Sequence, residues 1–195
     1  NAAVEIRAGE MVIDGGNYEA TADPLTVTPN GNGATVEGAA IGVSQHTTNL
    51  PTRVTIKNGT FRGAYSIWEK DVQDEVARDV ITLSVENGTF KGAVYSQNNA
   101  SFIKGGTFSD APAQDYLAEG YASVTASANP LTYKVVKATK AEDAASIDAR
   151  LNNRETVVVA QSFELNYETK VSAYKSATLK LEGGVITTDN FPGKN

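Results

Sequence analysis

The sequence contains no cysteine and only one histidine, one tryptophan and one methionine among its 195 residues. The absence of cysteine excludes disulfides, catalytic thiolates and thiolate metal sites. Because His46 is the only histidine, a site with several histidine ligands is excluded, and a Ser-His-Asp arrangement would have to use this residue. His46 lies in a polar stretch at 45–51, Gln-His-Thr-Thr-Asn-Leu-Pro, where we expect an ordinary loop residue. We predict no metal and no cofactor.

The chain also lacks a cluster of basic residues and a long apolar run. Its formal net charge is −6, from 23 Asp and Glu against 17 Lys and Arg. A nucleic-acid partner normally requires a basic stripe that neutralises phosphates, so this class of partner is disfavoured. No apolar run approaches the roughly 20 residues that span a bilayer, so we expect no membrane span. Since the chain starts at Asn1 without a signal peptide, we expect a mature or excised piece.

What the sequence does contain is a recurring phrase, clearest as Val-Thr-Ile-Lys-Asn-Gly-Thr-Phe at 54–61. Each copy has alternating apolar residues, then a charged residue, a glycine-centred bend, and a return to an aromatic or aliphatic residue. Internal repeats determine architecture before any local pattern does. The copies lie at 11–18, 54–61, 83–90, 101–108 and 179–186. Their defining residues are Asn58, Gly59, Phe61, Asn87, Gly88, Phe90, Gly105, Gly106, Phe108, Gly183 and Gly184.

The spacing of the copies predicts an all-β fold built as a right-handed parallel β-helix. Residues 1–109 alternate apolar and polar positions in short runs, which suits strands. Asn58 to Asn87 is 29 residues and Asn87 to Gly105 is 18, whereas Gly15 to Asn58 is 43, where we expect two turns of chain. Intervals near 20 residues with insertions are typical of solenoid coils, while a β-sandwich, the second choice, would turn every 8–12 residues.

The remainder of the chain divides into two further pieces. Residues 110–137 are expected to form a closing element and an extended linker, with Asp115 as an N-cap and Gly120 as the end of one short turn. Residues 138–195 are expected to contain one short amphipathic helix near 139–151, with Ile147 and Leu151 on its apolar face, followed by opening strands.

Two features of the phrase predict structural roles. Phe61, Phe90 and Phe108 follow the bend at the same register, so stacked coils would place their rings above one another in the core. Asn58 and Asn87 match the N-glycosylation acceptor pattern, as does Asn99. We favour a structural role for the first two, either because Asn tolerates left-handed backbone or because their side-chain amides stack between coils.

A charged stretch after Phe61 holds the only tryptophan and is the best candidate for a binding surface. Aromatic rings beside carboxylates and an arginine could stack on and hydrogen-bond to sugars, although an ordinary solvated loop is the interpretation that we favour. The candidate residues are Tyr65, Trp68, Glu69, Asp71, Asp74, Glu75 and Arg78. A calcium-dependent lyase site could use Asp14, Asp74, Asp79 and Lys104, but scattered aspartates usually serve turns. We therefore expect no enzyme.

Taken with Ser-Asp-x-x-x-x-Asp-Tyr-Leu-Ala-x-Gly-Tyr at 109–121, the phrase resembles the right-handed parallel β-helix (pectate-lyase-like) repeat segments of large bacterial surface proteins. In that family 109–121 resembles a closing element and 141–186 an opening element. The resemblance implies a non-enzymatic structural or adhesive element, extracellular or on the cell surface. A carbohydrate-active β-helix enzyme, a glycan-binding module and a phage fibre are the alternatives.

The order of these pieces predicts a partner. A closing element precedes an opening element, and an uncapped coil would expose unpaired strand edges over an apolar core. We expect residues 138–195 to cover the Asn1 end of the same chain or of the next copy in a head-to-tail series. Other copies of this chain, and glycans, are thus the expected partners.

Overall fold

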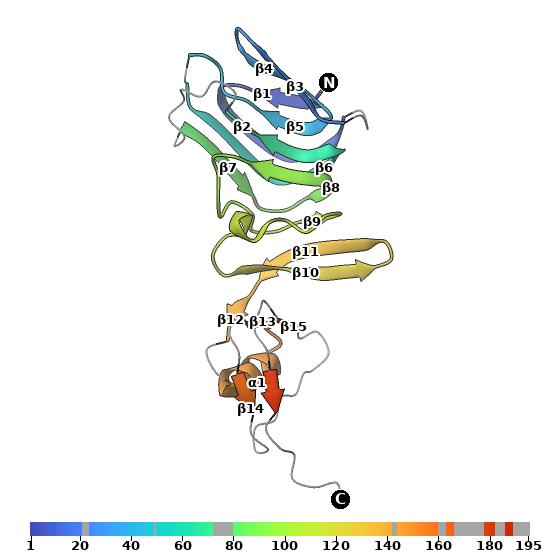
Figure 1. The fold of residues 1–195 in the computed structure, drawn as a ribbon, viewed down its shortest axis with the longest axis vertical. Coiled ribbons are helices and arrows are strands. Elements are labelled where there is room, and N and C mark those ends of the chain that lie inside the picture. The colour runs from blue at the N-terminus through green and yellow to red at the C-terminus, as the bar shows by residue number, and fades with distance from the viewer. Residues whose placement is uncertain are drawn as a thin grey trace, which may run out of the picture. The chain divides into compact units, whose positions relative to one another are not determined.

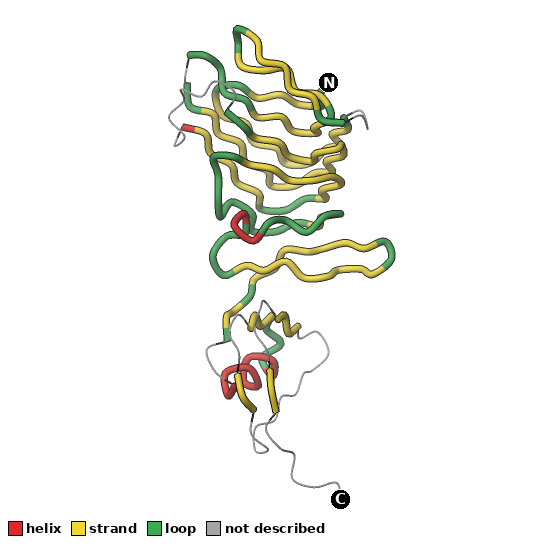
Figure 2. The backbone as a smooth tube through the Cα atoms, viewed as in Figure 1, coloured by secondary structure: helices red, strands yellow, loops and turns green. Residues whose placement is uncertain are grey.

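Strand β6 (Thr52–Glu69), 18 residues long, connects most of the strands in the N-terminal part of the molecule (Figure 1). The computed structural model describes residues 1–20, 24–48, 50–71, 80–141, 144–159, 163–165, 178–181 and 186–188. Within these residues the chain is mostly strand with one α-helix (Figure 2), so the all-β prediction is confirmed. It divides into two compact units, residues 1–119 with 123–135, and residues 120–122 with 136–195.

The strands of the first unit pair mainly in parallel. The first half of β6 lies between β2 and β7, and its second half lies between β5 and β8. β1 adds to the far side of β5, and β9 adds to β8. These strands are β1 (Val4–Ile6), β2 (Gly9–Glu19), β5 (Ala39–Val43), β7 (Ile81–Val85), β8 (Thr89–Ser96) and β9 (Thr107–Phe108). Successive segments of the chain thus lie on one another as layers. A layer is one pass of the chain, whose strands pair with strands of the pass before it and of the pass after it.

The long first interval of the repeat holds an inserted hairpin, so the prediction of two turns of chain there is wrong. β2 pairs directly with β6, which makes Tyr18 and Phe61 register partners. The extra residues form an antiparallel hairpin of β3 (Thr26–Asn30) and β4 (Gly33–Glu37). A hairpin satisfies its own backbone hydrogen bonds, so it lengthens a layer without adding another.

Parallel stacking ends at β9, whose next neighbour is antiparallel. Strand β11 (Leu131–Lys137) pairs with β9, and β10 (Tyr121–Ala128) follows β11. The stretch expected to be an extended linker is therefore an antiparallel hairpin. A 3-10 helix (Gln114–Tyr116) precedes it, and Asp115 lies inside this helix, so its prediction as an N-cap is wrong. Gly120 has φ +75°, consistent with its predicted place at the end of the turn.

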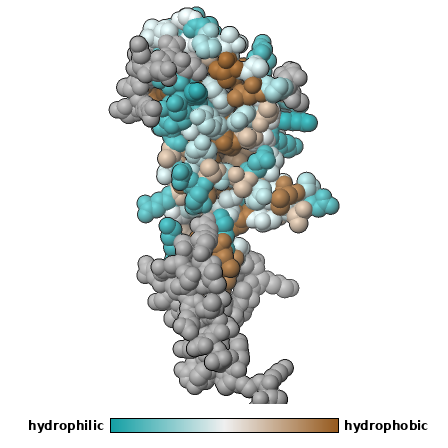
Figure 3. Space-filling model, viewed as in Figure 1, coloured by the Kyte–Doolittle hydropathy of each residue, from teal (hydrophilic) through white to brown (hydrophobic). Residues whose placement is uncertain are grey.

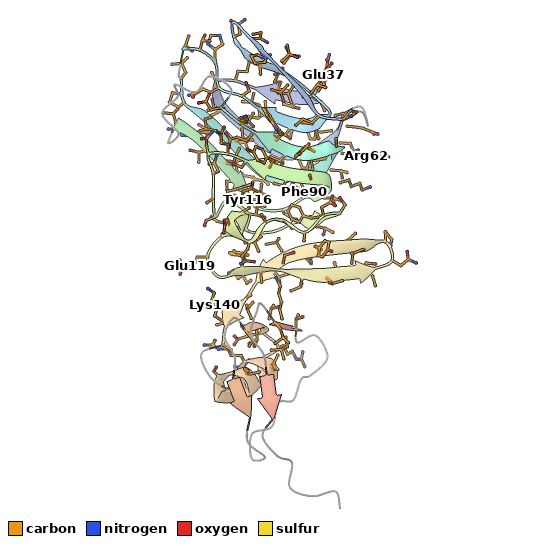
Figure 4. The ribbon with its side chains drawn as sticks, in the orientation of Figure 1. Glu37, Arg62, Phe90, Tyr116, Glu119 and Lys140 are labelled. Atoms are coloured by element: carbon orange, nitrogen blue, oxygen red, sulfur yellow. The ribbon has the colours of Figure 1, made fainter. Side chains whose placement is uncertain are left out.

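The core of the first unit contains a column of stacked rings, which confirms the prediction for Phe61, Phe90 and Phe108. Their centroids lie 5.0 and 4.6 Å apart with interplanar angles of 12° and 11°, and Tyr18 stacks on Phe61 at 5.2 Å. All three phenylalanines are fully buried. Phe90 points from β8 into the stacked strands (Figure 4).

The glycine of each phrase makes room for the ring that follows it. Gly59 and Gly88 both have φ +138°, a conformation that side chains rarely adopt. A Cβ at Gly59 would lie 2.8 Å from the ring of Phe61, and one at Gly88 would lie 3.1 Å from the ring of Phe90. The bend therefore folds each ring back over its own glycine, which explains why Gly and Phe recur two residues apart.

The described part of the second unit contains the helix, a three-stranded parallel sheet and a separate parallel pair of strands. Helix α1 spans Ala144–Asn152, later than predicted, because Thr139–Lys140 form strand β12 against β13 (Thr156–Val159). Ile147 and Leu151 are fully buried in a cluster with Val157 and Val159, as the predicted apolar face requires. β13 pairs with β15 (Thr178–Leu181), and β14 (Phe163–Leu165) pairs with β16 (Ile186–Thr188), both in parallel. Gly183 and Gly184 lie outside the described residues.

Candidate functional site

An open groove of about 460 Å³ lies between the inserted hairpin and the stacked strands of the first unit. The hairpin side contributes apolar residues, and β6 and β8 contribute aromatic ones. The lining residues are Leu25, Val27, Pro29, Tyr65, Trp68, Lys70, Asp71 and Tyr95. Figure 3 shows apolar side chains interspersed with polar ones over one face of these strands. The groove thus unites the aromatic part of the predicted surface with residues that the sequence did not indicate.

The strand pattern explains how the aromatic side chains reach this groove. Ile67 is buried inside the layers, so its neighbour Trp68 points to the outer face. Trp68 is nevertheless only 4% exposed, because it packs with Val36, Ala39 and the partly buried Leu25 and Val27 at the hairpin. Without the hairpin, this tryptophan would be a solvent-exposed residue of β6.

Tyr95 repeats the position of Trp68 in the next layer. The two are register partners in the parallel pairing of β6 with β8. Tyr95 is 36% exposed, whereas Trp68 is 4% exposed. Tyr95 was not among the residues predicted from the sequence, although its place one repeat after Trp68 was a signal that could have identified it.

The charged residues of the groove are Lys70 and Asp71, which directly follow β6. Lys70 is exposed, and its backbone N–H donates to Val43 C=O at 3.2 Å. Asp71 is 7% exposed and makes a polar contact of its own. Aromatic faces beside one cation and one carboxylate can stack on a sugar ring and hydrogen-bond to its hydroxyls.

Glu69 does not line the groove, although the sequence placed it among the binding candidates. Its side chain is fully buried, and it accepts hydrogen bonds from Ser96 Oγ at 2.5 Å and Asn98 Nδ2 at 2.6 Å. Asn98 N–H and Asn99 Nδ2 donate to it at 2.9 and 3.3 Å. The carboxylate thus anchors the loop that follows β8, which is a structural role.

The role of Glu69 as a buried anchor depends on tertiary contacts and was therefore difficult to predict from the sequence. Glu69 and Ser96 are register partners in adjacent layers, 27 residues apart in the chain. The polar cluster Ser-Gln-Asn-Asn at 96–99 was a signal for hydrogen bonding to a buried partner. That this partner is Glu69 follows only once the register of β6 and β8 is known. Without that register, an acidic residue in a charged stretch is expected to be exposed to solvent.

The other predicted residues are not brought together. Asp74, Glu75, Arg78 and Asp79 lie outside the described residues. Asp14 belongs to β2, whereas the N–H of Lys104 bonds to Val85 C=O beyond β7. With β6 and β7 between them, three strand spacings of about 4.8 Å separate these two residues. The pair therefore cannot act on one bound group.

His46 belongs to the loop, as expected. Its Nδ1 accepts a hydrogen bond from Thr48 N–H at 3.0 Å and lies 2.9 Å from Thr48 Oγ1. In the part of the chain that the structure describes, no three His, Cys, Asp or Glu residues are grouped as metal ligands would be. The described residues also contain no helix that is long and apolar enough to cross a membrane.

No protein-family model, curated protein or solved structure matches this chain.

Proposed function

We propose that the chain is a segment of right-handed parallel β-helix and serves as a non-enzymatic structural element of an extracellular or cell-surface protein. The single observation that supports this role is the in-register parallel pairing of β2, β6, β7 and β8 around one column of aromatic rings. Each layer in such an arrangement is held by backbone hydrogen bonds and by ring stacking on both sides. A stack of this kind resists bending and forms a stiff spacer.

The location can be tested directly. Antibodies against the folded chain are applied to intact cells of the source organism and, in parallel, to permeabilised cells. A structural surface element should be labelled on intact cells at nearly the same level as after permeabilisation. Labelling only after permeabilisation would contradict the proposed location.

A catalytic role receives less support from the described residues. A β-helix polysaccharide lyase needs carboxylates that hold calcium and a base close to them. The groove brings together Asp71 and Lys70, while Asp14 and Lys104 are separated by two strands. Incubating the protein with a panel of acidic polysaccharides, with and without calcium, should give no unsaturated product. Calcium-dependent product formation would favour the enzyme over the structural role.

The groove supports glycan binding as a second candidate function, which would make the structural element adhesive. The supporting observation is that Tyr65, Trp68 and Tyr95 line one groove with Lys70 at its edge. On a glycan array, we expect Tyr95→Ala to reduce binding by roughly tenfold, because losing one stacking face removes about 1–1.5 kcal/mol. Tyr133→Ala, in β11 away from the groove, is the control. Equal binding by both variants and the unsubstituted chain would place the ligand elsewhere.

A phage fibre is the remaining alternative, and it would assemble as a trimer. Mass measurement in solution distinguishes it, because a stable trimer at all concentrations would contradict the proposal.

A further inference from the structure

At the N-terminal end of the first unit, β1 extends one layer beyond β2. β2 and β5 both pair directly with β6, so they belong to the same layer. β1 pairs with the opposite edge of β5 and therefore lies one layer beyond it. Among the described residues no strand pairs with the corresponding far edge of β2. Tyr18, in β2, stacks on Phe61 and is only half-buried.

The second unit has a free strand edge of its own. β15 pairs with β13 on one side, and no described strand pairs with its other side. Leu179 and Leu181 are the register partners of Val157 and Val159, which are fully buried next to α1. The two leucines continue this apolar column, yet they are 37% and 54% exposed. An apolar column that ends in exposed leucines at an unpaired strand edge is the arrangement expected where a further layer would pack.

The two edges carry copies of the same phrase. Residues 179–186 read Leu-Lys-Leu-Glu-Gly-Gly-Val-Ile, and residues 11–18 of β2 read Met-Val-Ile-Asp-Gly-Gly-Asn-Tyr. Inside the first unit, copies of this phrase lie directly on one another, with Met11 on Val54 and Ile13 on Ile56. The copy in β15 and β16 therefore has the spacing needed to lie on the copy in β2.

The directions of the backbone groups on β2 agree with this match. Gly9 N–H donates to Pro51 C=O at 2.8 Å, so Gly9 faces β6. In a parallel ladder, alternate residues bond to opposite neighbours. The N–H and C=O groups of Glu10 and Val12 consequently point away from β6, toward the free edge.

The same reasoning applies to β15. Ala141 N–H donates to Val158 C=O at 2.9 Å, so Val158 faces β12 and its neighbour Val157 faces β15. Where two residues of neighbouring parallel strands are aligned, only one of them hydrogen-bonds to the other strand. The backbone N–H and C=O of the second residue point to the opposite side of its own strand. Leu179, the partner of Val157, therefore directs its N–H and C=O to the free edge, and so does Leu181.

These directions exclude every register that is shifted by an odd number of residues. With Leu179 aligned on Met11, its N–H and C=O meet the free groups of Glu10 and Val12. A shift by one residue would oppose groups that point away from each other and would also turn the leucines to the outer face. The alignment of the repeated phrase selects this register among those that the hydrogen-bond directions allow.

We propose that β15 and β16 of one copy of this chain pair, in parallel, with β2 of a second copy. Leu179 then lies on Met11, Leu181 on Ile13, and Ile186 at the register position of Tyr18. The inference rests on the proposed structural role and specifies its partner. Because the two edges differ, each copy keeps one of each, and the contact continues head to tail without closing.

Mass measurement at increasing concentration tests the contact. The unsubstituted chain should associate, and Leu181→Asp should raise the dissociation constant at least about tenfold, because a carboxylate would be buried in the new layer. Leu131→Asp is the matched control, since Leu131 is 51% exposed in β11 and Leu181 is 54% exposed. A chain that stays monomeric throughout, or equal effects of the two substitutions, would overturn the proposal.

Cross-linking tests the register. The chain has no cysteine, so Val12→Cys and Lys180→Cys variants each carry a single thiol. Mixed under mild oxidation, they should form a disulfide-linked dimer, whereas Asn17→Cys mixed with Lys180→Cys should give at least about tenfold less, because five residues of strand separate the positions. Equal yields would overturn the register. A disulfide within one chain of the Val12→Cys, Lys180→Cys double variant, with no mixed dimer, would show that the segment covers its own chain.

The thermal unfolding of each variant, measured alongside, separates this proposal from the proposed function. Folded variants without the cross-link would overturn the contact and leave the structural role intact. Absence of surface labelling would overturn the proposed surface location, whatever the cross-linking shows.

Discussion

Truncating the middle ring of the aromatic column tests how the layers are held together. Phe90 is fully buried between Phe61 at 5.0 Å and Phe108 at 4.6 Å. Phe90→Ala removes the ring from both neighbours and leaves a cavity between strands that are fixed by hydrogen bonds on each side. Large-to-small core substitutions of phenylalanine cost about 3–5 kcal/mol, and a site that cannot collapse lies in the upper part of this range. We therefore expect Phe90→Ala to lower the free energy of unfolding by about 4–5 kcal/mol.

The comparison within the column makes this expectation specific. Tyr18 is half-buried and stacks on one ring only, Phe61. Tyr18→Ala should cost about 1–2 kcal/mol, because it loses one ring pair and part of one side chain's burial. The difference between the two variants thus measures the contribution of a ring packed on both faces.

Urea unfolding followed by tryptophan fluorescence is the suitable assay. Trp68 is the only tryptophan and belongs to the first unit, so its signal reports on the layers themselves and not on residues 136–195. A Phe90→Ala cost below about 1 kcal/mol, or one equal to that of Tyr18→Ala, would refute the argument that stacked rings stabilise the layers.

Two further substitutions test the bend and the buried carboxylate. Gly88→Ala should destabilise the first unit by about 1–3 kcal/mol in the same assay, since Gly88 has φ +138° and the new Cβ would meet the ring of Phe90. Gly31→Ala, where nothing lies within 4 Å, is the control and should change stability little; similar effects at both sites would contradict the role of the bend. Glu69→Ala should cost about 3 kcal/mol, because it leaves the buried hydroxyl of Ser96 and the partly buried amide of Asn98 without their acceptor. A stability equal to that of the unsubstituted chain would show that the loop after β8 does not depend on this carboxylate.

The sequence by itself determined the features that depend on short spacing. Apolar alternation predicted the strands, and the recurrence of Phe61, Phe90 and Phe108 after a glycine bend predicted the column of rings. Ile147 and Leu151 were predicted to face a core, because residues four apart share one face of a helix. In each case the residues that identify the feature are neighbours in the chain or occupy equivalent places in a repeat.

Only the tertiary structure decided which distant segments meet. The 43 residues from Gly15 to Asn58 accommodate either another layer or a hairpin, and pairing of β2 with β6 selects the hairpin. That hairpin buries Trp68 and forms the groove. The burial of Glu69 depends in turn on its alignment with Ser96 in the next layer. Such contacts follow from register between layers, and register is set by the packing of all the layers together, so no local pattern contains it.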